Sequence, residues 1–278
     1  IVPTFKKQPA LFTAPCAGCF FIPFLFMIPH RINHQPAFLL ASSPWRENSL
    51  RLEVFSRDYG RVALLARSAR ARGSELRGIL TPFVPLSISW FGKEELKTLH
   101  RAEWVGGWQQ PKNLLLFSAL YANEILLKLT AREDPHPNLY HALAQLMRHF
   151  GTGQHHLAPL RHFEWQLLHE LGYAPSAQHD CQQQPIEAQA NYLMRPETAA
   201  ERMAEAESSL HSVPNSCIIS GDVLQALETS SLQPHQLQAA LALNRLFIQH
   251  YLPEGIVSRQ TLHQLQQMKQ KLSSEISP

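Results

Sequence analysis

The residues with the clearest chemical character are arginines, and they are concentrated in one stretch. Residues 57–77 contain six arginines against Asp58 and Glu75, a local net charge of +4 on a chain whose total is +3. Guanidinium groups at this density could bind the phosphates of a nucleic acid. They could equally keep the edge of a β-hairpin soluble. Charge alone does not separate these two interpretations.

The charge is also uneven along the whole chain. Residues 31–104 hold twelve Lys and Arg against seven Asp and Glu, whereas residues 180–230 hold two against eight. A basic front half followed by an acidic connector indicates an anionic partner for the front half. The hydrophobic share of 45% and the charged share of 17% are those of a soluble globular protein, and 278 residues are enough for two domains.

Sequence patterns of catalysis and metal binding are missing. Residues 151–153 (Gly-Thr-Gly) lack the third glycine and the lysine of a phosphate loop, so we expect no ATP hydrolysis. The fifteen histidines form no His-Glu-x-x-His motif, and there is no Gly-x-Ser-x-Gly elbow. Cys16 and Cys19 have zinc or redox spacing, but no second pair matches them. We therefore expect no enzyme, no cofactor and no metal site, and four scattered cysteines favour a reducing cytoplasm.

The first 29 residues are expected to lie outside the fold. Residues 20–28 (FFIPFLFMI) are apolar but too short to span a bilayer, and Pro23 interrupts them. No small-residue cleavage site follows, so a signal peptide is not indicated. Met27 is a candidate initiator, with residues 1–26 an upstream extension or a gene-model artefact.

The elements that must position the arginines are predicted to be a small β-barrel followed by helices. Apolar alternation predicts strands at residues 37–42, 50–55, 62–66, 86–90 and 96–104, with a hairpin turn at residues 57–60. Five short strands with one long basic loop are typical of a closed barrel. Helical periods then predict helices at residues 114–133, 139–150, 159–172, 234–251 and 259–272, with Ser258 as the N-cap of the last. Residues 174–217 read as a polar, acidic connector with at most a short helix near residues 199–210.

Aromatic residues are interleaved with the basic ones in residues 45–104. Single-strand binding needs cations for the phosphates and flat rings for the bases. Trp45 and Trp104 belong to this aromatic set, but Tyr59 at the hairpin tip and Phe91 beside a turn are the better stacking candidates. Alternation assigns Phe83 and Trp90 to the barrel core instead. Contacts from the basic residues to the nucleic-acid backbone would give little sequence preference. The predicted DNA-binding surface comprises Arg46, Arg61, Arg67, Arg70, Arg72, Arg77, Lys93, Lys97 and Arg101 with Tyr59 and Phe91.

Four segments, in order, resemble one known family. PWRENSLRLEVFSRDYGRVALLARSAR, LRGILTPFVPLSISWFGKEELKTLHRAE, LYANEILLKLTAREDPHPNLY and LRHFEWQLLHELGY are similar to segments of the RecO family of bacterial recombination mediators. The resemblance covers residues 30–173 and continues more weakly through GDVLQAL and Val257-Ser258-Arg259. It implies an α+β protein, with an OB-fold barrel over residues 30–106 and a helical domain over residues 107–278.

The resemblance also implies function and partners. Such a protein binds single- and double-stranded DNA, anneals complementary strands and, with RecR, helps load RecA onto DNA coated by SSB, in the cytoplasm at the nucleoid and away from membranes. Many members hold a four-cysteine zinc site after the LGY segment. Here only Cys181 and Cys217 remain, near His179, so we expect this member to have lost the zinc.

The resemblance places a dock for the acidic SSB C-terminal tail on the helix at residues 159–172. Such a tail needs a cation beside an apolar hollow. Arg161 matches the family position, and Trp165 and Lys128 are further candidates; pairing of Arg161 with Glu164 or Glu124 is the alternative. A different class also stays open, an OB-fold adaptor that binds RNA or a protein.

Overall fold

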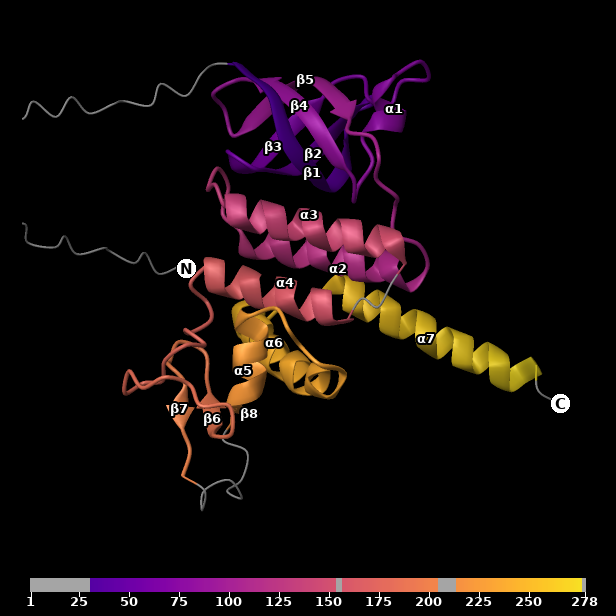
Figure 1. Ribbon diagram of the computed structural model, residues 1–278. Coiled ribbons are helices and arrows are strands. Elements are labelled where there is room, and N and C mark those ends of the chain that lie inside the picture. Colours follow the sequence, from indigo (N-terminus) through magenta and orange to yellow (C-terminus); the bar gives the residue numbers. More distant parts are fainter. Residues whose placement is uncertain (1–30, 154–156, 205–213, 277–278) are drawn as a thin grey trace, which may run out of the picture.

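A computed structural model describes residues 31–153, 157–204 and 214–276. The chain forms a β-barrel that rests on a layer of helices, with further helices beyond that layer (Figure 1). The expectations for residues 1–29, which include Cys16, Cys19 and Met27, lie outside the described residues. In the parts of the chain that are described, no helix is both long and apolar enough to cross a membrane.

The barrel has the strand order β1-β2-β3-β5-β4 and is closed. A short helix, α1 (Leu76–Ile79), lies between β3 and β4, which together with this order gives an OB-fold and confirms the predicted fold class. All five predicted strands are present, and β1 begins earlier than predicted because its first residues pair with the end of β4. The strands are β1 (Arg31–Trp45), β2 (Ser49–Ser56), β3 (Gly60–Ala66), β4 (Pro85–Phe91) and β5 (Leu96–Trp104).

Alternate residues of these strands fill the barrel. Leu52, Leu64 and Trp90 are almost fully buried in one apolar cluster, as the period of two requires. Phe83, which we predicted to lie in this core, instead joins Phe38 and other side chains in a second cluster shared with the helices. The barrel therefore buries apolar side chains both inside itself and against the helical layer.

Helices α2 (Leu114–Leu129) and α3 (Pro137–Thr152) lie directly against the barrel (Figure 1). Asn123 of α2 donates its amide protons to the carbonyl oxygens of Leu39 and Leu40, at 3.2 and 3.3 Å. The register of β1 shifts at this point, so a buried side chain satisfies carbonyl oxygens that a bulge takes out of the ladder. The other helices are α4 (Leu157–Glu170), α5 (Gly221–Glu228), the single-turn η2 (Pro234–Gln236), α6 (Leu237–Tyr251) and α7 (Val257–Ile276).

The predicted connector contributes β6, β7 and the first residue of β8 to a small antiparallel sheet of order β7-β6-β8, so the rear domain is not all helical. Its strands are β6 (Asn191–Met194), β7 (Glu201–Arg202) and β8 (Cys217–Ser220). The short helix expected near residues 199–210 is wrong over residues 199–204, where β7 lies, and the remainder is outside the described residues. Tyr192 and Met194 are fully buried, so four residues of β6 supply a core contact that the polar composition of the connector concealed.

The start of α7 also differs from the prediction. The helix begins at Val257, so Ser258 lies in its first turn and is not the N-cap. The carboxylate of Glu124 accepts the amide protons of Val257 and Ser258 at 2.7 and 2.8 Å. A side chain from α2 thus satisfies free amides of α7 and fixes where α7 leaves the domain.

Candidate nucleic-acid interface

Two loops at one end of the barrel carry the largest group of exposed arginines. These loops are the β1–β2 turn, residues 46–48, and the segment that leads from β3 into α1, residues 67–77. The backbone N–H of Arg70 donates to the carbonyl oxygen of Asn48 at 2.9 Å, and its Nη1 donates to the carbonyl oxygen of Glu47 at 3.2 Å. The two loops are therefore joined, and we call this surface the arginine end; its arginines are Arg46, Arg67, Arg70, Arg72 and Arg77.

The five guanidinium groups of the arginine end are available to a ligand. All five residues are exposed, and within the described residues none forms an ion pair with a carboxylate. Two of them, Arg70 and Arg77, line a cavity of about 330 Å³ beside the apolar side chains of Leu50 and Leu76. Cations around a partly apolar hollow can hold the phosphates and sugars of a nucleic acid strand.

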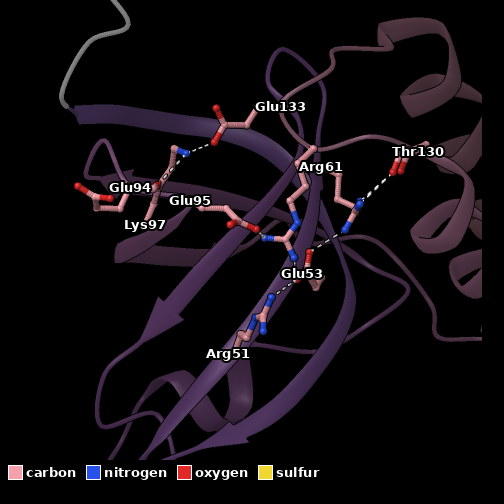
Figure 2. A network of polar contacts seen from close by, with 9 residues as sticks. Arg51, Glu53, Arg61, Glu94, Glu95, Lys97, Thr130 and Glu133 are labelled. Atoms are coloured by element: carbon pink, nitrogen blue, oxygen red, sulfur yellow. Dashed lines mark hydrogen bonds and ion pairs between the residues drawn. The ribbon is translucent and has the colours of Figure 1, made fainter. Parts of the chain in front are cut away.

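Arg61 and Lys97 lie elsewhere, in a polar network that joins the barrel to the helical domain. Glu53 of β2 lies at its centre, near Arg51 and Arg61 (Figure 2). The Glu53 carboxylate accepts from Arg51, Arg61 and Arg132 at 3.3, 3.2 and 2.6 Å. Arg61 also donates from Nε and Nη2 to the carbonyl oxygen of Thr130, at 3.1 and 2.9 Å. Arg61, Arg132 and Glu53 form a charge-paired junction in which both guanidinium groups already have partners.

The chain between α2 and α3 completes this junction. The backbone N–H of Glu133 donates to the carbonyl oxygen of Arg61 at 2.9 Å, and the Glu133 carboxylate pairs with the buried ammonium group of Lys97. Gly60 has φ +63°, and a Cβ atom there would lie 2.0 Å from the carbonyl oxygen of Asp134. Residues 130–135 thus cover the start of β3. We call this set of contacts, together with Glu53, Arg61 and Arg132, the domain clamp.

The remaining predicted DNA-binding residues lie toward the opposite ends of the strands. Phe91 is 43% exposed and pairs with Arg31 at the start of β1, whereas the arginine end adjoins the end of β1. Lys93 is exposed on the β4–β5 turn, and Arg101 is exposed but pairs with Glu103. Tyr59 packs edge-on against Trp90, with ring centroids 5.4 Å apart, and lines a cavity of about 110 Å³ at the barrel mouth. The predicted surface is therefore divided.

The predicted SSB-tail residues are mostly interior. Arg161 is 6% exposed and its guanidinium lies 2.8 Å from the carboxylate of Glu164, so the Arg161–Glu164 pairing is confirmed. The Asn244 amide donates to the same carboxylate at 3.0 Å, and Trp165 is 3% exposed. Lys128 is exposed but donates to the carbonyl oxygen of Gly255 at 2.9 Å.

Arg259, a cation outside the residues predicted for the site, lies closer to the surface than Arg161 does. Arg259 of α7 is half-buried and donates to the hydroxyl oxygen of Tyr121 at 2.7 Å. Its guanidinium also lies 4.6 Å from the centre of the Tyr121 ring. Burial raises the pKa of Tyr121 well above its usual value, so the phenol stays protonated. The sequence pointed to this residue only through the Val257-Ser258-Arg259 segment, which did not indicate that Arg259 contacts Tyr121.

The residues near Cys181 and Cys217 do not fit a structural zinc site. Cys181 is exposed, burial raises the pKa of the Cys217 thiol, and the described residues contain no group of three metal ligands. Asp180, 2% exposed, instead accepts the amide protons of Gln182 and Gln184, both at 2.8 Å. A carboxylate therefore organises this loop through its backbone amides.

Comparisons with known proteins agree with this architecture. The family described as "Recombination protein O N terminal" matches residues 30–108, and "Recombination protein O C terminal" matches residues 114–260. A "DNA repair protein RecO" from Neisseria meningitidis serogroup C is 53% identical over 245 residues, which are 88% of this chain and 93% of that protein. Those of Neisseria gonorrhoeae and Chromobacterium violaceum are 52% and 40% identical, over 87% and 86% of this chain and 98% of each relative. The chain therefore belongs to the RecO family of DNA repair proteins.

Proposed function

We propose that the arginine end binds the phosphate backbone of DNA and that this binding lets the chain anneal complementary strands. The observation that carries the proposal is the set of five exposed arginines, free of carboxylate partners within the described residues, on two loops that Arg70 joins. In the cell, at the nucleoid, the annealing activity and RecR would together help load RecA onto SSB-coated DNA. The partners come from the family resemblance.

The mechanism needs no nucleotide hydrolysis. Two single strands repel each other through their phosphates, and guanidinium groups that neutralise some of these charges reduce that repulsion. Contacts to phosphates leave the base edges free to pair, so the sequence of the strands matters little. The cations of the domain clamp are already paired with Glu53 and Glu133, so phosphate binding is left to the arginine end.

Fluorescence-monitored renaturation of complementary oligonucleotides, bare or coated with SSB, tests the proposal. The charge reversal belongs at Arg67 and Arg72, because Arg70 also joins the two loops. We expect Arg67→Glu/Arg72→Glu to slow annealing at least about tenfold through lost phosphate contacts. Lys93→Glu/Arg101→Glu is the matched control, because it changes the net charge by the same amount toward the opposite ends of the strands. Equal rates for the first variant and the wild type would reject the proposal.

The SSB tail is a separate proposal, centred on Arg161 with Trp165 and Lys128. Because Arg161 is buried and paired with Glu164, the tail carboxylate would reach it only by replacing Glu164. Tail-peptide binding by Arg161→Ala tests this, and unchanged affinity would remove the claim. Glu164→Gln serves as a second variant, since it frees the Arg161 guanidinium and should strengthen binding of the tail.

An OB-fold adaptor for RNA or for a protein is the alternative function. Phosphate contacts alone do not distinguish DNA from RNA, because that distinction requires the 2′-hydroxyl group. Binding assays with DNA and RNA oligomers of the same sequence separate the two. Tighter binding of RNA would favour the adaptor.

A further inference from the structure

The end of β1 continues past its last pair with β4, Phe38↔Pro85, while β2 stays paired with β3 up to Leu50; we call this end of the β1–β2 hairpin the arm. Register pairs continue from Ser42↔Leu52 to Trp45↔Ser49, and residues 42–45 of β1 are all exposed. The turn that follows begins with Arg46, whose φ is +52°. The arm is therefore a paired and ordered support whose tip lies at the arginine end, where Glu47 and Asn48 are bonded to Arg70.

Trp45 is the large aromatic side chain of this arm. It is 37% exposed and belongs to neither of the two apolar clusters that form the cores. Trp45 pairs with Ser49, so it lies on the opposite face of the hairpin from Pro44 and Leu50, and it is Leu50 that faces the cavity lined by Arg70 and Arg77. An indole on an ordered hairpin, next in sequence to the exposed Arg46 and near the tip that is bonded to Arg70, provides both contacts that an unpaired nucleotide requires, a flat ring and cations.

We propose that Trp45 is a stacking platform for an unpaired base of single-stranded DNA, with the adjoining phosphates on the arginine end. This inference rests on the proposed function and adds to it a preference for single strands. The base would lie on the indole while the adjoining phosphates contact Arg46, next in sequence, and the loop that Arg70 joins to the hairpin. A base inside a duplex is already stacked on its neighbours, so double-stranded DNA gains only the phosphate contacts.

The two aromatic residues favoured by the sequence are less suited to this role. The ring of Tyr59 packs edge-on against Trp90 at the barrel mouth, in a cavity that Glu133 also lines. Phe91 is exposed, but it lies toward the other end of the strands and its ring contacts His100 edge-on, with centroids 6.4 Å apart. Neither ring adjoins the arginine end.

The test compares a thymidine oligomer with an abasic oligomer of equal length, which has the same phosphates and no bases. Fluorescence anisotropy measures the affinity of the full-length protein for each. We expect the wild type to prefer the thymidine oligomer by about tenfold, the scale of one stacked base. Trp45→Ala should lose this preference with its abasic affinity unchanged, whereas Trp45→Phe and Phe91→Ala should retain it.

Other outcomes are distinguishable. Arg67→Glu/Arg72→Glu should weaken both affinities equally; if it weakens neither, the proposed function fails irrespective of Trp45. A wild type with no preference for bases, or a Trp45→Ala variant that keeps the preference, overturns the stacking proposal and leaves phosphate binding standing. Loss of the preference in Phe91→Ala alone would move the stacking surface to the opposite end of the barrel and also overturn it.

Discussion

At the scale of single residues, Gly60 combines a backbone conformation that favours glycine with a close contact to the chain between α2 and α3. Its φ of +63° is one that side chains other than glycine rarely adopt, and the backbone of Asp134 occupies the place of a Cβ atom. The sequence predicted the turn at Gly60, but only the structure shows why no side chain fits there.

We therefore expect Gly60→Ala to lower the free energy of unfolding by at least about 2 kcal/mol, from backbone strain and from displacement of residues 130–135. Urea titration measures the loss. Gly73→Ala is the matched control, because nothing lies within 4 Å of a Cβ atom there. Equal stability of Gly60→Ala and the wild type would mean that residues 130–135 do not cover β3.

Glu124 gives a prediction that depends on pH. Burial alone raises the pKa of its carboxyl group, but the amides of Ser258 and Val257 and the Lys128 ammonium outweigh burial, so the pKa is lowered. A lowered pKa stabilises the fold above the ordinary pKa of a glutamate, and this stability is lost as the pH falls through the lower, folded value.

Glu124→Gln should thus be less stable than the wild type by about 1 kcal/mol at neutral pH, the usual scale of a helix cap. The difference should shrink in acid and vanish once Glu124 is protonated in the folded protein. Urea titrations from neutral to acidic pH measure it, with the exposed Glu254→Gln as control. A difference that persists unchanged in acid would contradict the capping role.

At the scale of elements, the domain clamp couples the barrel to α2 and α3 through Glu53. Three arginines contact this one carboxylate, whose side chain is 13% exposed. Glu53→Gln should cost about 2 kcal/mol of unfolding free energy, because hydrogen bonds to charged groups are lost and Arg61 keeps no carboxylate partner. Glu103→Gln, in the exposed pair with Arg101, should cost less than about 0.5 kcal/mol. Similar losses for both variants would show that Glu53 is no more than a surface charge.

The elements themselves were largely predictable from local patterns. Alternation of apolar residues located all five barrel strands, and Gly172, with φ +72°, follows α4 as expected. The clamp was not predictable, because Arg61 and Thr130 are far apart in sequence and an arginine has the same local pattern whether free or paired. Likewise, the charge of residues 57–77 indicated the arginine end but could not separate Arg61 from Arg67.

At the scale of the whole molecule, the barrel has two differently charged regions. The region toward the helices is neutralised in the domain clamp, and the arginine end has free cations at the tips of joined loops. We propose that DNA binds at the arginine end, in the stretch where the sequence concentrates its arginines. The sequence could not place this site, because it could not show which of the predicted cations were already paired.

The most direct measurement is the affinity for single-stranded DNA as a function of salt concentration. Neutralisation of about five phosphates predicts a log–log slope near −3.5 for the wild type. Arg67→Glu/Arg72→Glu should bind at least about tenfold more weakly, with a slope reduced in magnitude to about −2, whereas Lys93→Glu/Arg101→Glu should match the wild type in both. A flat salt response, or equal losses in the two double variants, would contradict the account.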